Sequence, residues 1–348
     1  MLISQNLRNH TNSTARRFTR QFTFHVGCSW ASKPRLDSEE DFKKKSAYSD
    51  KHEVARWRTK MLGDRYNLIG DAGEDFWFIE PLKNDSGIAL GVADGVGGWF
   101  SAKVDPSKFS QTLMWAASKK AGNLIASEAQ PKDLIEAGHQ GVLKMEEVKA
   151  GSSTACIVTL DAKTGLLKGA NLGDSTFILI RDNEVVESTK QQTHFFNCPY
   201  QLAKLRKGID KNHITDYANS ADLFETTLQE GDCIVLFTDG LGDNVFTNEI
   251  VQLKQAVEGH IQDGTITEKS QALADTLVSY ARICMDDEFK VSPIELSARQ
   301  EKIKGFMGIM IIRAEQIFQG KVDDNSSQRR TTLIFIGPFL LDSADKPP

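Results

Sequence analysis

Short apolar runs that alternate with turn residues dominate the middle of the chain. These runs are rich in β-branched or aromatic side chains and are bounded by Gly, Asp or Asn, which is typical of β-strands. Turn residues separate runs that follow closely in the sequence, so antiparallel meanders are predicted rather than parallel strands joined by helices. The predicted strands are residues 76–79, 88–93, 154–160, 177–180 and 233–238.

Longer segments repeat their apolar residues at the spacing of an α-helix. Pro106 opens one such segment, and Phe109, Leu113 and Ala117 follow on one face, a pattern that predicts a core-facing helix. Helices that alternate with short strands predict an α+β fold in which helices cover two sheets. Further helices are predicted at residues 131–148, 247–258 and 267–285.

The N-terminal region differs in composition from the rest of the chain. Residues 1–36 contain six Lys or Arg and no Asp or Glu, which is typical of a mitochondrial transit peptide. A disordered basic tail is the alternative. Residues 37–60 are rich in charged residues and Ser, so we predict a linker there. The main folded domain is then expected at residues 61–325, with a separate tail at 326–348.

The composition of the 348-residue chain argues against several classes of partner and site. Its net charge of -5 gives no basic footprint, so no nucleic-acid partner is expected. No run approaches the roughly 18 apolar residues of a membrane-spanning helix. The five cysteines include no Cys-x-x-Cys pair, so neither a disulfide framework nor a zinc site is predicted. We expect a monomer in a reducing compartment, the mitochondrial matrix.

Two Asp-Gly pairs stand where a strongly apolar run stops. Asp94-Gly95 follows residues 88–93, and Asp239-Gly240 follows residues 233–237. A carboxylate there, followed by a glycine whose backbone can approach a ligand, suits a hard cation such as Mg²⁺ or Mn²⁺. A single Asp-Gly pair is more often a plain turn. Two such strand ends predict one shared metal site, with Asp94 as the ligand common to two ions.

Six acidic or glycine-rich motifs occur in an order that resembles a known family. Together with the segment Gln-Gln-x-His-x-Phe-Asn at 191–197, they resemble the PP2C family of metal-dependent protein serine/threonine phosphatases, and especially its mitochondrial branch. The motifs are Gly-Glu-Asp at 73–75, Gly-Val-Ala-Asp-Gly-Val-Gly-Gly-Trp at 91–99, Gly-Ser-Ser-Thr-Ala at 151–155, Asn-Leu-Gly-Asp-Ser at 171–175, Thr-Asp-Gly-Leu with Asp-Asn at 238–244, and Gly-Lys-Val-Asp-Asp at 320–324.

The resemblance implies a four-layer α/β/β/α sandwich of two antiparallel sheets, with two Mn²⁺ or Mg²⁺ ions at one edge. It implies that a hydroxide bridging the ions attacks phosphorus in phosphorylated protein substrates. It also associates such enzymes with mitochondrial metabolism, including coenzyme Q synthesis. The implied metal ligands are Asp94, which bridges both ions, the Gly95 carbonyl, Asp239, Asp324, Glu74 and Asp75, with Asp174 and Asp243 holding a third ion in some members.

The chain departs from the family pattern at the phosphate-binding and acid positions. Gly70 stands where the larger family has a phosphate-binding arginine, and Arg58 and Arg65 are candidate substitutes. Val96 follows the bridging Asp-Gly where that pattern has a histidine that acts as the acid. His194 is a candidate acid, although a solvated loop histidine is the simpler interpretation. The substrate-binding residues are therefore not predicted.

The C-terminus departs further. The family continues from its last Asp directly into a strand, whereas this chain has Asn-Ser-Ser-Gln-Arg-Arg at 325–330 before the apolar run 333–336. The last core strand is therefore expected to be missing, displaced or replaced. A catalytically impaired PP2C-fold binding or regulatory protein is the first alternative function. A metal-dependent nuclease is a weaker one, against which the acidic balance argues.

Overall fold

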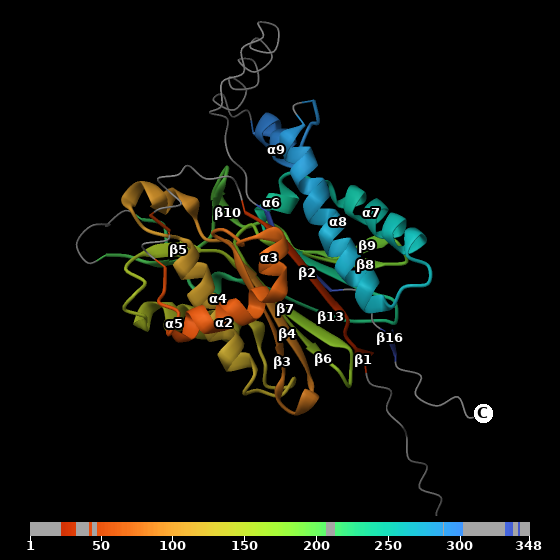
Figure 1. The fold of residues 1–348 in the computed structure, drawn as a ribbon, viewed down its shortest axis with the longest axis horizontal. Coiled ribbons are helices and arrows are strands. Elements are labelled where there is room, and N and C mark those ends of the chain that lie inside the picture. Colours follow the sequence, from red (N-terminus) through yellow and green to blue (C-terminus); the bar gives the residue numbers. More distant parts are fainter. Residues whose placement is uncertain are drawn as a thin grey trace, which may run out of the picture.

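Two five-stranded antiparallel sheets lie at the centre of the molecule, and helices cover them on both sides (Figure 1). The computed structural model describes residues 22–32, 42–43, 47–206, 213–287, 289–301, 331–336 and 340–341. The predicted α+β fold with helix-covered antiparallel sheets is confirmed.

Sheet 1 is a meander with one added edge strand. Its spatial order is β13-β7-β6-β4-β3, and every neighbouring pair is antiparallel. The strands are β3 (Phe76–Pro81), β4 (Gly87–Ala93), β6 (Ala155–Asp161), β7 (Leu166–Leu172) and β13 (Asp222–Thr227).

Sheet 2 combines strands from distant parts of the sequence. Its order is β2-β15-β14-β8-β9, also antiparallel throughout. Its strands are β2 (Val26–Ala31), β8 (Thr176–Arg181), β9 (Glu184–Ser188), β14 (Cys233–Phe237) and β15 (Thr331–Ile336). Short pairs join β1 (Phe22–Thr23) to β16 (Leu340–Leu341), β5 (Gly151–Ser153) to β12 (Leu202–Lys204), and β10 (Thr193–Phe195) to β11 (Cys198–Pro199).

Alternate residues of sheet 2 enter two different hydrophobic cores. Ile234 and Leu236 of β14 pack in the core that contains sheet 1. Cys233, Val235 and Phe237 pack in a second core with the helices on the other side. Because successive side chains of a strand point to opposite faces, sheet 2 lies between sheet 1 and a helical layer. This alternation accounts for the layered architecture.

The helices divide between the two outer layers (Figure 1). Phe109, Leu113 and Ala117 of α4 are fully buried in the core of sheet 1, as their spacing predicted, while α8 lies along β2 and β15. The helices are α2 (Glu53–Leu62), α3 (Tyr66–Ile69), α4 (Ser107–Ala121), α5 (Pro131–Lys144), α6 (Asp239–Gly242), α7 (Thr247–His260), α8 (Ile266–Asp286) and α9 (Pro293–Gln300), with 3-10 turns η1 (Gly63–Arg65), η2 (Lys83–Asp85), η3 (Gly97–Ala102) and η4 (Ala218–Ser220).

The folded domain begins earlier than the predicted boundary at residue 61. Strands β1 and β2 lie inside the predicted leader, and α2 lies inside the predicted linker. Every second residue from Phe22 to Trp30 packs against the core of sheet 1, which is the period of a strand. The basic composition around this alternation concealed it. Residues 1–21, on which the leader prediction now depends, lie outside the described residues.

The C-terminal segment also differs from the prediction of a divergent tail. Residues Thr331–Ile336 form β15, which pairs with β2 on one side and β14 on the other. A central strand of sheet 2 therefore comes from this segment, and the extra residues 325–330 precede it. Residues 302–330, which include Asp324 and the apolar run 306–312, lie outside the described residues.

Two other sequence predictions concern thiols and membranes. All five cysteines are free, and burial raises the pKa of the Cys156 thiol to about 12. Such a thiol stays protonated and unreactive at neutral pH, as expected of a core residue. None of the helices in the described ranges combines the length and apolar character needed to span a bilayer.

Candidate metal centre

The pairing of β3 with β4 brings two predicted ligands to one edge of sheet 1. Phe76 pairs with Ala93, so Asp75, just before β3, stands opposite Asp94, just after β4. The exposed fractions of Asp75 and Asp94 are only 1% and 3%, and Glu74 is equally buried at 2%. Buried carboxylates are costly unless their charge is compensated, so this edge has the character of a functional site.

The second Asp-Gly pair reaches this edge from sheet 2. Strand β14 ends at Phe237, and the hydroxyl of the next residue, Thr238, donates to the Asp75 carboxylate over 2.9 Å. Asp239 follows directly and begins α6. This hydrogen bond joins the loops that carry Asp75 and Asp239 across the two sheets.

Gly95 occupies a position that excludes a side chain. A Cβ atom there would lie 2.7 Å from the Glu74 carbonyl oxygen and 2.8 Å from that of Pro106. The Ser110 hydroxyl also donates to the Glu74 carbonyl. The backbone around Gly95 is therefore packed between the acidic pair and the start of α4, with no room for a side chain.

The segment 152–154 holds the backbone of Asp94 in place. The Asp94 amide donates to Thr154 Oγ1 and the Thr154 amide donates to the Asp94 carbonyl, each over 3.0 Å. Thr154 Oγ1 is hydrogen-bonded in turn to Ser175 Oγ at 2.8 Å. Sequence reasoning missed this positioning role, although a Gly-Ser-Ser-Thr run before a strand carries the hydroxyl groups that it requires.

Trp99 and Ser152 both have structural roles beneath the loop. The Trp99 indole donates to Ser152 Oγ over 2.7 Å, and Ser152 donates to Gln201 Oε1 over 2.6 Å. The two side chains are buried, with exposed fractions of 8% and 0%. Trp99 therefore packs under the Asp94 loop, and the buried Ser152 hydroxyl is not available as a nucleophile.

The candidates for a third ion share a small pocket. Asp174 and Asp243 both line a cavity of about 130 Å³, together with Gln191 and Asn197 of the predicted family-like segment. The Asp243 amide donates to the Asp239 carbonyl over 2.7 Å, so the pocket adjoins the second Asp-Gly pair.

The donor set has the chemistry of a hard-cation site. The side chains at this edge offer carboxylate oxygens, which Mg²⁺ and Mn²⁺ prefer. Within the described ranges, no three His, Cys, Asp or Glu side chains form a group that could hold a metal ion. Asp324, the partner predicted for Asp239, lies outside those ranges. The individual metal-binding roles stay predictions.

Both candidate phosphate-binding arginines are engaged elsewhere. Arg65 forms an ion pair with Asp275 of α8. Arg58 pairs with Asp71 at 2.6 Å, and Lys43 pairs with the other oxygen of Asp71 at 2.5 Å. Burial alone would raise the pKa of Asp71, but Lys43 and Arg58 outweigh it and hold that pKa at about 2. These cations fix the loop that leads to Glu74.

His194 lies in the β10–β11 hairpin and is paired with an acid. Its Nε2 lies 2.9 Å from Asp216 Oδ2, and its ring stacks on Tyr200 with centroids 4.3 Å apart. The same Asp216 oxygen accepts from the Gln201 amide over 2.9 Å. His194 is exposed, as a loop histidine would be, but it also anchors this hairpin through Asp216.

Comparisons with known proteins identify the family of this chain. The family model of Stage II sporulation protein E (SpoIIE) matches residues 84–289, more than half of the chain. "Protein phosphatase PTC7 homolog fig" of Drosophila grimshawi is 35% identical over 65% of this chain and 72% of its own length. The human "Protein phosphatase PTC7 homolog" is 38% identical over 58% of this chain and 68% of its own.

A solved structure shows the same fold. The photosystem II phosphatase PBCP superimposes with a TM-score of 0.59, covering 91% of this chain and 98% of its own, at 24% identity. At that identity the likeness concerns the fold, whereas the family assignment depends on the matched model and the more similar relatives. The chain belongs to the PP2C-type family of serine/threonine protein phosphatases.

Proposed function

We propose that this protein removes phosphate from phosphoserine and phosphothreonine in proteins, using two divalent cations, Mn²⁺ or Mg²⁺. The observation that carries the proposal is the hydrogen bond from Thr238 to Asp75, because it joins the loops of the two Asp-Gly pairs at one edge. When bound, such ions supply an activated water and neutralise charge on the phosphoryl group.

The protein residues then have distinct roles. We propose that Asp94 is a ligand of both ions, with the Gly95 carbonyl on one and Asp239 and Asp324 on the other. Glu74 and Asp75 would bind metal directly or through water, and the pocket lined by Asp174 and Asp243 would accept a third ion. The two hydrogen bonds between Thr154 and the Asp94 backbone keep that backbone fixed. The carboxylate therefore needs little reorganisation during turnover.

The site of action is proposed from the sequence. The acid-free, basic composition of residues 1–21 supports import into the mitochondrial matrix. The resemblance to the mitochondrial branch supports a role in metabolic control, including coenzyme Q synthesis, and a monomeric enzyme is proposed. Fluorescence microscopy of residues 1–21 fused to a fluorescent protein tests this location. A fusion that stays in the cytosol would contradict the proposal.

The impaired-protein alternative loses its main premise. It assumed that the last core strand was lost, but β15 pairs with both neighbours in sheet 2. Membership of a protein phosphatase family likewise favours phosphoprotein hydrolysis over nuclease activity. An active phosphatase is therefore the function that we propose.

The test is hydrolysis of a phosphoserine peptide by the purified full-length protein with Mn²⁺. Asp94→Asn is expected to lower the rate by about 1,000-fold, on the scale of losing one preorganised electrostatic group. Asp85→Asn is the matched control, since Asp85 is exposed at the opposite end of the β3–β4 hairpin and should retain full activity. An Asp94→Asn protein as active as the control would refute the proposal.

A further inference from the structure

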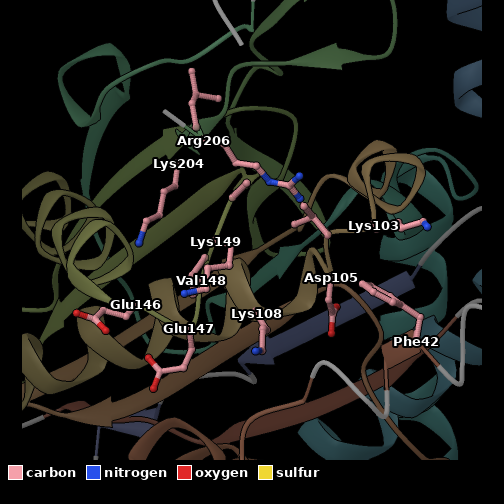
Figure 2. A pocket seen from close by; sticks show the side chains of 13 residues that line it. Phe42, Lys103, Asp105, Lys108, Glu146, Glu147, Val148, Lys149, Lys204 and Arg206 are labelled. Atoms are coloured by element: carbon pink, nitrogen blue, oxygen red, sulfur yellow. The ribbon is translucent and has the colours of Figure 1, made fainter. Parts of the chain in front are cut away.

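A large pocket with an excess of cationic side chains opens beside the Asp94 loop. Its volume is about 950 Å³. Figure 2 shows Lys204 and Glu146 at one end of the pocket and Lys103 and Phe42 at the other. Three acids also line it, yet the cations outnumber them in a chain whose net charge is -5. The cationic residues are Lys103, Lys108, Lys149, Lys204 and Arg206, and the acids are Asp105, Glu146 and Glu147.

The cationic side chains differ in whether they form hydrogen bonds or ion pairs within the protein. Lys204 Nζ donates to the carbonyls of Val142 and Met145 at the end of α5. Arg206 donates to the Ala102 carbonyl over 3.1 Å. By contrast, Lys103 and Lys149 are exposed. Neither side chain forms a hydrogen bond or ion pair with any described residue, so both are available to a ligand.

Two of the three acids already contact other groups of the protein. Asp105 Oδ1 accepts from the Ser107 amide and hydroxyl, over 3.0 and 2.6 Å, at the start of α4. Glu147 lies 3.7 Å from His52 Nε2. With these two acids engaged, Glu146 is the remaining lining acid, so the five cations keep the local charge positive.

The pocket adjoins the loop that carries Asp94. Gly95 forms an isolated antiparallel β-bridge with Ser153 of β5. Lys149 lies four residues before Ser153 in the sequence. At about 3.3 Å per residue, the backbone of Lys149 is at most about 13 Å from that bridge. The pocket wall includes Val104 and Ala150, which pack against Trp99 under the Asp94 loop.

We propose that this pocket binds an anionic side chain of the protein substrate, up to about four residues from the phosphorylated residue. The inference rests on the proposed function, because it presumes that the phosphoryl group lies at the Asp94 edge. An extended peptide covers about 13 Å in four residues, so a side chain up to about four residues away can reach as far as Lys149. The recognised group is a carboxylate or a second phosphate, since each complements an uncommitted ammonium group.

The experiment compares phosphoserine peptides that differ only at the positions three to five residues away. One peptide carries Glu at these positions, another carries Gln, and a third carries a second phosphoserine. The enzyme variants are Lys103→Gln with Lys149→Gln, and a control, Lys83→Gln with Lys163→Gln. The control removes the same charge from exposed lysines at the far end of sheet 1.

The wild type is expected to prefer the Glu peptide over the Gln peptide by about 5- to 10-fold in kcat/KM, the scale of one or two partly exposed charge pairs. The Lys103/Lys149 variant should lose this preference through KM alone, and the control should keep it. Hydrolysis of a small aryl phosphate should be unchanged in both variants. A larger preference for the doubly phosphorylated peptide would identify phosphate, rather than carboxylate, as the natural ligand.

Equal kcat/KM values for the Glu and Gln peptides in the wild type would overturn the inference while leaving the proposed function intact. Equal losses on both peptides in the Lys103/Lys149 variant would do the same. Binding to anionic vesicles that only this variant loses, with unchanged peptide kinetics, would overturn it in favour of a lipid surface. No hydrolysis of any phosphoester by the wild type would overturn the proposed function itself, and this inference with it.

Discussion

The two sheets that meet at the candidate metal centre are assembled from very different parts of the chain. Sheet 1 uses strands between residues 76 and 227, and its central strands follow one another in a meander. Sheet 2 places β15 between β2 and β14, so Ile336 pairs with Val26 from the opposite end of the chain. The Asp94 side of the site therefore depends mainly on strands between residues 76 and 172, whereas the Asp239 side depends on pairing segments from opposite ends of the chain.

The difference predicts where the fold is most vulnerable. A chain truncated after Arg330 would lack β15, which would leave β14 and β2 without their shared neighbour. Domains are stable by only about 5–15 kcal/mol, so we expect loss of cooperative folding, measured by circular dichroism during heating. Val186→Thr, on the exposed edge strand β9, is the control and should unfold as the wild type does. An unchanged midpoint after truncation would show that sheet 2 does not need β15.

On the sheet 1 side, a single methyl group should be damaging. Gly95→Ala places a Cβ atom against two carbonyl oxygens, so the backbone of the Asp94 loop must shift. A displacement of about 1 Å can lower a rate by about 100-fold. Gly98→Ala is the matched control, because no atom lies within 4 Å of a Cβ there. Equal turnover of a phosphopeptide by the two variants would contradict this packing argument.

The link between the two sheets should have an intermediate effect. Thr238→Val keeps the shape of the side chain but removes the hydroxyl that donates to Asp75. Residues that orient metal ligands typically contribute about 10- to 100-fold to affinity or activity. We expect a loss of that size in Mn²⁺ affinity by calorimetry, and none for Thr227→Val, an exposed residue of β13. Full affinity in the Thr238→Val protein would mean that this contact does not position the site.

The smallest predicted effect concerns pH and the loop before the acidic pair. The folded pKa of Asp71 is about 2, below its ordinary value of 3.8, so its ion pairs stabilise the fold above pH 4. That stability is lost as the pH falls from 4 through 2, and it amounts to about 1–2 kcal/mol for this partly exposed group. Urea unfolding should show Asp71→Asn destabilised at pH 7 and progressively less so below pH 4. A difference that stays constant with pH would contradict the assignment.

The same contrast explains what sequence reasoning could recover. The strands and helices of sheet 1 follow local periodicity, and β3, β4, β6 and α4 all form where the pattern predicted them. The predicted boundaries of the domain differ from the structure because β2 and β15 pair across almost the whole length of the chain, which local patterns do not reveal. The strand-like alternation of Phe22, Phe24 and Val26 is visible in the sequence, but the basic composition around it favoured a transit peptide instead.

Part of the site was also accessible from sequence alone. An apolar run followed by Asp-Gly correctly indicated that Asp94 and Asp239 terminate buried strands. The supporting contacts of Thr238 and Thr154 could not be inferred, since each joins residues far apart in sequence. Arg58 and Arg65 looked available because their partners, Asp71 and Asp275, are identified only by the folded chain.

The central claim is that the two Asp-Gly pairs contribute to one metal centre. Mn²⁺ titration by calorimetry of Asp94→Asn, Asp239→Asn and the double variant tests it most directly, because sites that act as a unit are not additive. The account predicts that each single change weakens binding strongly and that the double variant is little worse than either. Additive losses, with each single variant retaining one ion at full affinity, would show two independent sites and contradict the account.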